Sequence, residues 1–207
     1  RRDILEWTGA DPAHVRVVGN GVAAQFQPQG RAHAPGYPYF LHVGRRASHK
    51  NVARLLQAFA GLRGHGGLRL LFTGPPDAAT QTLARQEGVL DAIDFAGERD
   101  DDGLAMLYRG AVALVFPSLY EGFGLPVVEA MACGTAVLTS GNTSLAEVAG
   151  ESHALLVDPT RADAIGQAMQ QLLDDNPLRE RLRAGGPARA ALFNWDAVAT
   201  RVRASLG

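Results

Sequence analysis

The stretch AVALVFPSLYEGFGLPVVEAMACGT, residues 111–135, holds a strand, a turn and a helix in direct succession. Residues 111–116 are apolar at every position, which is typical of a strand covered on both faces in a parallel sheet. The turn that follows is rich in glycine, and Pro126 suits the first turn of a helix because its missing N–H costs nothing there. The stretch therefore predicts one strand–helix unit of an α/β sheet.

The chain on both sides alternates strands and helices in the same way. Strands are expected at 39–43, 68–73, 92–96, 111–116, 136–139 and 153–157. Helices are expected at 50–63, 79–87, 102–109, 125–132, 144–148, 161–174, 177–191 and 195–205, after a first short helix that ends near Gly9. This alternation predicts a doubly wound, Rossmann-like parallel sheet of the α/β class, which binds its ligands at the carboxyl ends of the strands.

Composition limits the class of protein. The 207 residues are 46% hydrophobic and 20% charged, which is ordinary for a soluble domain, and the net charge of −1 does not suggest a nucleic-acid partner. Cys133 is the only cysteine, which excludes an intrachain disulfide and a cysteine-based zinc site. The apolar runs are short for a membrane span and the start lacks a signal-peptide pattern, so a cytoplasmic location is expected.

One motif suggests a dinucleotide. The sequence GNGVAA, residues 19–24, matches the pattern G-x-G-x-x-A and follows a strand-like VRVV. That pattern requires a helix that opens on the glycines. Here QFQPQG follows, and it cannot continue a helix, so we expect no dinucleotide site.

A run of three acidic residues suggests a metal. Asp100, Asp101 and Asp102 could hold a divalent cation through their carboxylate oxygens. They also precede the helix expected at 102–109, where acidic side chains cap a helix and meet its positive end. No further carboxylate or histidine cluster lies nearby in the sequence to complete a metal shell. Helix capping is therefore the favoured interpretation, and no metal is expected.

The turn at the centre of the opening stretch is a candidate anion site. The amides of Phe123, Gly124 and Leu125 fall at a helix N-terminus, at the carboxyl end of a strand. Most helix starts bind nothing, so an ordinary strand–turn–helix corner is the alternative. Glu121 and Glu129 flank this turn, and their role decides between the two.

Three roles are open to Glu121 and Glu129: a glycosidase pair, a metal site, or no chemistry at an ordinary helix start. A retaining glycosidase needs carboxyl groups about 5–5.5 Å apart, whereas Glu129 lies in the second turn of the helix, well removed from Glu121 in the loop. A carboxylate beside an anion site is better suited to accept hydrogen bonds from hydroxyls. Hydroxyls next to phosphates indicate a sugar nucleotide.

A second segment supports this interpretation. The sequence YFLHVGRRASHKN, residues 39–51, is another strand that ends in a glycine, with Arg45, Arg46 and Lys50 in the turn before a helix. Cations at the carboxyl end of a sheet strand are well placed to bind a diphosphate. A solvated basic turn is the alternative for this segment alone. His49 is interpreted as a surface residue.

These segments resemble a known family. The run FPSLYEGFGLPVVEAMACGTAVLTS, with its E-x7-E spacing, closely resembles the family 4 glycosyltransferases of the GT-B fold. HVGRRASHKNVARLLQAF, VVGNGV and LLVDP…FNWDAVA are similar to further segments of that family, so the resemblance covers nearly the whole chain. It matches only the C-terminal, donor-binding domain of such enzymes. The N-terminal domain, which holds the acceptor, is not matched.

The resemblance implies a role for each matched position. Arg45 and Lys50 would hold the donor diphosphate and stabilise the leaving group. Glu121 would face the transferred sugar, and Glu129 would bind the ribose hydroxyls. Arg99, in FAGER, would lie at the wall of the base site and act through its main chain. Main-chain groups near the sugar and phosphates would come from Gly44, Gly122, Phe123, Gly124 and Leu125.

The resemblance also implies an activity. We expect a retaining, metal-independent glycosyltransferase of the hexosyltransferase type, which takes its sugar from a nucleoside-diphosphate sugar and needs no further cofactor. The isolated domain is expected to be inactive. A GT-B epimerase that acts on a sugar nucleotide and a non-catalytic nucleotide-sugar-binding module remain the alternatives.

The domain boundaries follow from the same comparison. Residues 1–36 are expected to be the end of the absent N-terminal domain and the interdomain linker, and residues 37–191 the donor-binding domain. Residues 192–207 would be a helix that returns towards the N-terminal domain. The expected partners are the nucleotide sugar and that N-terminal domain, which would also make any peripheral contact with the inner face of the membrane.

Overall fold

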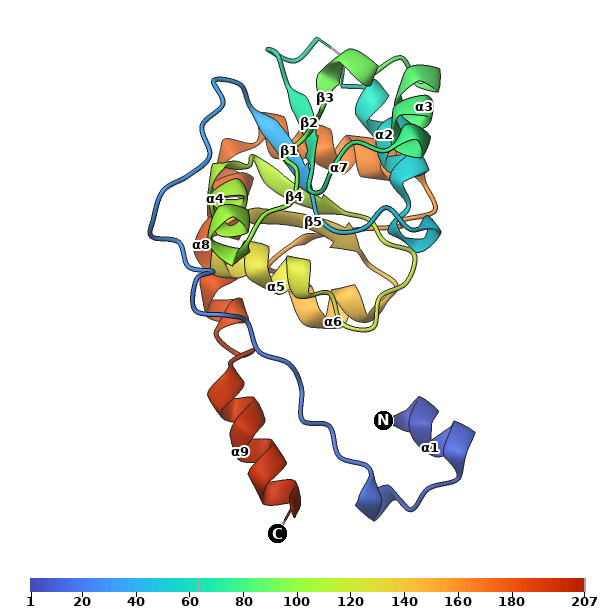
Figure 1. The fold of residues 1–207 in the computed structure, drawn as a ribbon, viewed down its shortest axis with the longest axis vertical. Helices are drawn as coiled ribbons and strands as arrows, with labels where there is room; N and C mark the ends of the chain where they lie inside the picture. The colour runs from blue at the N-terminus through green and yellow to red at the C-terminus, as the bar shows by residue number, and fades with distance from the viewer. Residues whose placement is uncertain (63, 207) are drawn as a thin grey trace.

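The body of the molecule is a parallel sheet (Figure 1). The computed structural model describes residues 1–62 and 64–206, and within these ranges six strands form one sheet in the order β3-β2-β1-β4-β5-β6. All neighbouring strands in it are parallel. The strands are β1 Tyr39–His42, β2 Arg69–Phe72, β3 Ile93–Phe95, β4 Ala113–Phe116, β5 Ala136–Ser140 and β6 Leu155–Val157. The predicted doubly wound parallel sheet is confirmed.

Helices follow the strands as the sequence predicts. In the described residues these are α1 Arg2–Thr8, α2 Val52–Ala60, α3 Ala78–Gln86, α4 Asp101–Gly110, α5 Leu125–Ala132, α6 Ser144–Ala149, α7 Ala162–Asp174, α8 Asn176–Ala190 and α9 Trp195–Leu206. Short 3-10 turns lie at η1 Pro12–His14, η2 Ser48–Lys50 and η3 Leu90–Ala92. None of the helices in these ranges is long and apolar enough to cross a bilayer.

Two predicted elements differ from the structure. The helix expected at 50–63 is divided, because Asn51 adopts a left-handed conformation between η2 and α2. Its predicted end at residue 63 lies outside the described residues. The last strand begins at Leu155, two residues after the predicted start at residue 153, because residues 151–153 form a turn.

The sheet is covered on both faces by helices. Leu41 and Leu114 belong to a core cluster with α4, α5 and α6, whereas their neighbours Phe40 and Val115 belong to a second cluster with α2, α3 and α7. All four side chains are fully buried. Successive strand residues thus enter opposite cores, which explains why the strands read as continuous apolar runs.

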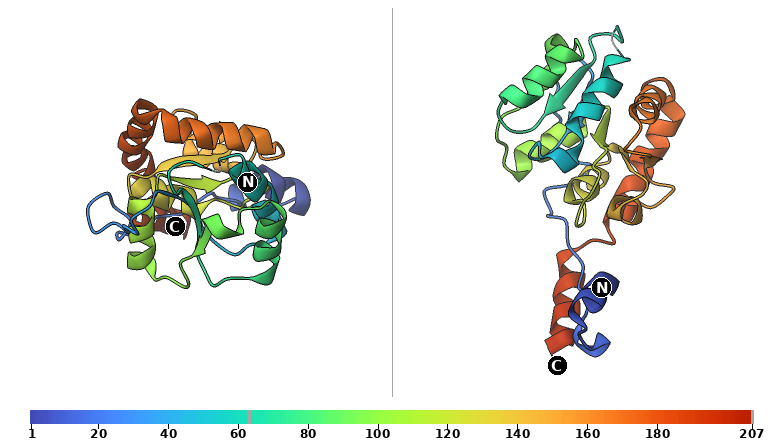
Figure 2. Two further views of the ribbon diagram at one scale, coloured as in Figure 1. Left: turned by 90° about the horizontal axis from the view of Figure 1, so that it is seen from above. Right: turned by 90° about the vertical axis from the view of Figure 1, so that its right-hand side faces the viewer.

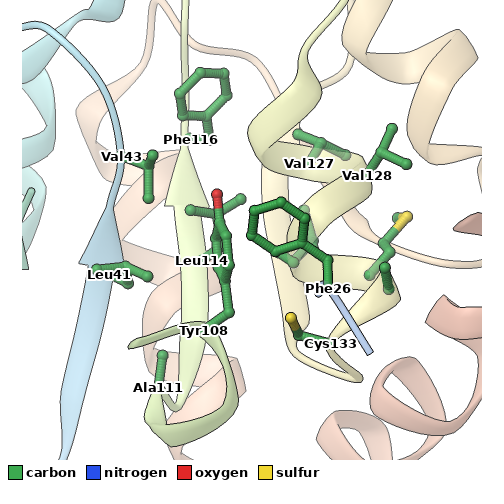
Figure 3. Packing of buried hydrophobic residues seen from close by; sticks show 14 of the residues in the cluster. Phe26, Leu41, Val43, Tyr108, Ala111, Leu114, Phe116, Val127, Val128 and Cys133 are labelled. Carbon is green, nitrogen blue, oxygen red and sulfur yellow. The ribbon is translucent and has the colours of Figure 1, made fainter. Parts of the chain in front are cut away.

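The Gly- and Pro-rich segment 26–38 carries no helix, as predicted, but it is bound to the domain. The ring of Phe26 packs edge-on to Tyr108 with 5.9 Å between ring centres (Figure 3). The amide of His33 donates to the carbonyl of Met106 at 2.9 Å. The backbone of residues 19–24 also opens no helix, which removes the geometry that a dinucleotide motif requires.

The two ends of the chain extend away from the sheet on the same side. In Figure 1 and in the right-hand view of Figure 2, both α9 and the N-terminal segment that contains α1 and η1 lie below the sheet, and Figure 1 shows α9 and α1 apart from each other. We call the N-terminal segment with α1 and η1, together with α9, the extension. A hydrogen bond of 3.1 Å from the side chain of Arg201 in α9 to the carbonyl of Val18 joins its two parts. Trp7 and Leu206 are 89% and 84% exposed, so large apolar side chains on the extension stay in solvent.

Candidate functional site

The strand order reverses between β1 and β4, which are neighbours in the sheet. Strands β2 and β3 lie on one side of this pair, and β5 and β6 lie on the other. The helices that follow the two central strands, α2 and α5, cover opposite faces. In sheets of this kind a crevice opens at the carboxyl ends of such a pair, and ligands bind there. Most of the predicted site residues lie in the loops that leave β1 and β4.

The structure brings Lys50 and Glu121 together from these two loops. The ammonium Nζ lies 2.6 Å from Glu121 Oε1, and each side chain is 13% exposed. The same ammonium lies 4.5 Å from the centre of the Phe116 ring. The amide of Leu119 donates to the carbonyl of His49 at 2.7 Å, which joins the loops a second time. Lys50 is also the only lysine in the chain.

In the first turn of α5, Pro126 has no N–H and the amide of Val127 donates to the carbonyl of Gly124 at 3.0 Å. The amides of Gly124 and Leu125, at the very start of the helix, are left without helical partners. No side chain of the described residues caps this helix.

Gly124 precedes α5 with φ 107°, and a Cβ there would come within 2.3 Å of Leu145 Cδ2, so glycine is required. Ser144 fixes the loop from the other side, because its Oγ donates to the carbonyl of Glu121 at 2.6 Å. The result is a shaped loop with open amides and a carboxylate beside it.

The remaining residues of this loop divide into two groups. The ring of Phe123 packs edge-on to Phe193 at 5.5 Å, so its side chain belongs to the core. Gly122 is exposed, and a Cβ there would meet no atom within 4 Å. Leu125 is 41% exposed. The Phe123 ring is partly buried against the core, and the predicted role of its main chain stays a prediction.

The two arginines after β1 have different surroundings. Arg46 donates from Nη1 to the carbonyl of Thr73 at 2.7 Å and also contacts Asp77 and the carbonyl of Pro75. Its guanidinium is therefore committed to the loop between β2 and α3. The side chain of Arg45 is exposed. Both arginines line the cavity that opens beside this loop, and of the two Arg45 is the more exposed.

A cavity of about 310 Å³ opens beside the loop that follows β1. Its lining includes Gly44, Arg45, Thr73, Glu98 and Arg99. The exposed Arg99 thus comes to the same cavity as Gly44 and Arg45, although it follows a different strand. Among the described residues, this lining does not include Lys50, Glu121 or Glu129. The predicted base wall at Arg99 therefore shares this cavity with Arg45, one of the two predicted diphosphate ligands, whereas Lys50 is not among the described residues of its lining.

Glu129 is held by a residue that the sequence did not single out. Tyr108 in α4 is fully buried and donates from its hydroxyl to Glu129 Oε2 at 2.8 Å. Figure 3 shows this hydroxyl pointing along β4 towards Phe116 at its carboxyl end. Burial raises the pKa of Glu129, and the hydrogen bond from Tyr108 partly offsets this. The only sequence signal was a tyrosine on the apolar side of a helix, which by itself indicates core packing.

His42 ends β1 and lies in the floor of the site. It is fully buried and its Nδ1 lies 3.0 Å from the carbonyl of Val115. Among the described residues its Nε2 has no hydrogen-bond partner. Burial lowers the pKa of His42 to about 4, and the charges of Lys50 and Arg46 act in the same direction. The imidazole is therefore neutral at neutral pH.

The acidic run before α4 caps the helix. Asp100 Oδ1 accepts a hydrogen bond from the amide of Gly103 at 2.9 Å, and Asp101 and Asp102 lie in the first turn. The capping prediction is confirmed for Asp100. Among the described residues no three or more His, Cys, Asp or Glu side chains are grouped so that they could hold a metal ion.

The chain belongs to the family described as glycosyl transferases group 1, whose model matches residues 24–189. It is 39% identical over 171 residues to the O-antigen chain mannosyltransferase B of Escherichia coli, a match over 79% of this chain and 44% of that protein. It is 29% identical to the solved sucrose-phosphate synthase from Thermosynechococcus elongatus, with a TM-score of 0.83, covering 97% of this chain and 54% of that one.

The extent of these matches bears on the fold. The chain spans less than half the length of the curated relatives it matches first. In contrast, it spans 97% of the solved C-terminal domain of a glycosyl transferase group 1 protein from Francisella tularensis, with a TM-score of 0.71 and 23% identity over 83% of this chain. The Rossmann-like sheet described above thus matches the sheets of GT-B glycosyltransferase structures, as predicted.

Proposed function

We propose that this chain is the C-terminal, donor-binding half of a retaining, metal-independent family 4 glycosyltransferase that uses a nucleoside-diphosphate sugar. The observation that carries the proposal is the Lys50–Glu121 pair beside the open amides of α5, at the strand pair where the order reverses. A cation and free amides suit phosphates, and a carboxylate suits sugar hydroxyls. The three lie on two loops that are joined by hydrogen bonds.

In this proposal Lys50 and Arg45 pair with the diphosphate, and the main chain from Gly122 to Leu125 approaches the phosphate and the sugar. When the bond to the sugar breaks, negative charge grows on the leaving diphosphate. Fixed positive groups that are aimed at this charge lower the barrier without reorganising. Lys50, Arg45 and the N-terminus of α5 would supply that field, so a bound cation is not required for it.

The remaining donor groups follow from their positions. Glu121 would accept hydrogen bonds from the transferred sugar, and Glu129 would bind the ribose diol through the oxygen that Tyr108 does not occupy. Gly44 and Arg99 line the cavity that we assign to the base. Several relatives are mannosyltransferases by name, and we propose a hexosyl donor on that basis.

We also propose that residues 1–36 and 192–207 belong with an N-terminal domain that binds the acceptor. The exposed apolar side chains of the extension support this, because large exposed apolar surface often marks a contact with another domain. Enzymes of this architecture would act in the cytoplasm, with any membrane contact made through the N-terminal domain.

Calorimetry tests the donor proposal. The chain should bind one of UDP, GDP, ADP or TDP more tightly than the corresponding nucleoside. Lys50→Ala should weaken binding of the nucleoside diphosphate by about tenfold or more, because a charge-assisted hydrogen bond contributes roughly 1.5–3 kcal/mol. Arg181→Ala removes one exposed charge from α8 and serves as the control. A chain that binds none of the four, or an equal loss for diphosphate and nucleoside, would refute the proposal.

A further inference from the structure

Asn51 has an unusual backbone conformation for its residue type. Its φ is 62° and its ψ is 32°, and among residues 1–62 and 64–206 it is the one non-glycine with positive φ. Such a conformation costs free energy and persists only where the surroundings determine it, often at functional sites. Asparagine tolerates it better than most side chains. The side chain is also buried, with 4% of its surface exposed.

The Asn51 side chain joins three loops. Its Nδ2 donates to the carbonyl of Pro117 at 3.0 Å and to the carbonyl of Pro159 at 2.6 Å. Its Oδ1 accepts from Arg54 Nη1 at 3.0 Å. The two prolines follow β4 and β6, while Asn51 itself follows β1. One amide group therefore connects the carboxyl ends of three strands.

This connection lies next to the proposed phosphate site. Asn51 is bonded directly to Lys50 in the chain, and Pro117 begins the loop that carries Glu121. The 2.6 Å contact between Lys50 and Glu121 requires that the loops after β1 and β4 keep a fixed separation. The left-handed residue ends η2 and starts α2, so the chain changes direction immediately after Lys50.

We propose that Asn51 is a positioning residue that presets the Lys50 ammonium against Glu121 for the donor diphosphate. The inference rests on the proposed function. Two features of one residue are used: the left-handed backbone turns the chain, and the amide fixes the loops on either side. Asn51 itself does not touch the donor. Its loss should therefore weaken diphosphate binding through the placement of Lys50.

Two substitutions separate these features. Asn51→Gly keeps the left-handed conformation and removes all the side-chain hydrogen bonds. Asn51→Asp keeps the size of the side chain but cannot donate to the two carbonyls. The ligand is whichever of UDP, GDP, ADP and TDP the unaltered chain binds most tightly. Both substitutions should weaken its binding by about tenfold or more, as expected for a displaced charge-assisted contact. Binding of the corresponding nucleoside should not change.

The single lysine supplies a readout that does not depend on ligand binding. In a chain labelled with isotopes at lysine, the ε signal in an NMR spectrum reports Lys50 alone. In ligand-free Asn51→Gly or Asn51→Asp this signal should move towards that of a solvent-exposed lysine. The control is Asp175→Ala, which removes the 2.8 Å cap bond that Asp175 accepts from the amide of Leu178 at the start of α8. It should lower Tm without moving the signal or changing binding.

The outcomes are distinct. If both Asn51 variants bind the diphosphate as tightly as the unaltered chain and leave the Lys50 signal in place, Asn51 only stabilises the fold and the inference is overturned. If Asn51→Gly does not fold, Asn51→Asp decides the question by the same two readouts. If the unaltered chain binds no nucleoside diphosphate, the proposed function fails, and the Lys50 signal still decides whether Asn51 positions the ammonium.

Discussion

The positive charge of Lys50 is already paired in the ligand-free chain. Its ammonium lies 2.6 Å from Glu121 Oε1 and faces the ring of Phe116. This pair is mostly buried, so removal of either partner would leave an uncompensated charge in the floor of the site. A donor diphosphate would therefore not meet a free lysine. Lys50 would contact both Glu121 and the diphosphate, and Glu121 would also accept hydrogen bonds from the sugar.

His42 should make the stability of the fold depend on pH. Its pKa is lowered from 6.5 to about 4, so below pH 6.5 the unfolded chain binds a proton that the folded chain does not. The contribution of His42 to the free energy of unfolding is fully present above pH 6.5. It is lost as the pH drops towards 4, by about 3 kcal/mol in total. Urea unfolding of the unaltered chain and of His42→Phe, between about pH 7.5 and about pH 5, measures this effect.

The free energy of unfolding should fall less between about pH 7.5 and about pH 5 in His42→Phe than in the unaltered chain, by about 2 kcal/mol. His14→Ala, which changes an exposed histidine in η1, should show the same pH dependence as the unaltered chain. An unchanged pH dependence in His42→Phe would show that another group is responsible.

At the scale of elements, the start of α5 depends on one particular glycine. Gly124→Ala places a Cβ within 2.3 Å of Leu145 Cδ2. It also requires a backbone φ of 107°, which residues with a Cβ rarely adopt. We expect a loss of about 2–4 kcal/mol, from backbone strain and overpacking together. Gly122→Ala, two residues earlier, meets open space and should cost less than about 0.5 kcal/mol. Urea unfolding of both variants tests this, and equal losses would contradict it.

The contact between α4 and α5 should set the pH at which Glu129 binds a ribose. The hydrogen bond from Tyr108 lowers the pKa of Glu129 against the larger effect of burial, which raises it. Tyr108→Phe should therefore raise this pKa further. Because only the carboxylate accepts two hydroxyls, the preference for ribo- over 2′-deoxynucleoside diphosphates should be lost at a higher pH in the variant.

Calorimetry with the ribo- and deoxy-ligands across a range of pH measures this preference. Tyr39→Phe is the matched control, because its hydroxyl donates to the carbonyl of Leu107 at 2.7 Å and does not contact Glu129. The profile of Tyr108→Phe would coincide with that of the unaltered chain if Glu129 had no part in ribose binding.

The elements could be predicted from the sequence because their signals are local. Alternating cores produce apolar strands, and Asp100, Pro126 and glycines mark the ends of helices. The break at Asn51 was missed, because its left-handed backbone is stabilised by carbonyls far away in the sequence. Lys50 and Glu121 were singled out by their places after two strands and by a family resemblance, and their roles in donor binding stay predictions. Their direct contact, like that between Tyr108 and Glu129, depends on how loops and helices meet, which no local pattern shows.

At the scale of the whole molecule, the groups proposed to bind the donor all lie on the sheet domain of this chain. The chain spans less than half of its first curated relatives. We expect it to bind a nucleotide sugar but not to transfer the sugar, since loss of acceptor positioning can remove about 7–11 kcal/mol of barrier lowering. A transfer assay on this chain and on a two-domain form measures the difference. Efficient transfer by the 207 residues alone would contradict the expectation.

The central claim is that a donor diphosphate binds at the carboxyl ends of β1 and β4, against Lys50. The most direct test is an NMR titration of the lysine-labelled chain with the nucleoside diphosphate that calorimetry selects. Because Lys50 is the only lysine, its ε signal reports this position alone. We predict that the signal shifts and saturates together with the calorimetric binding curve, and that the corresponding nucleoside leaves it unmoved. Tight binding of the diphosphate with an unchanged Lys50 signal would place the phosphates elsewhere and contradict the account.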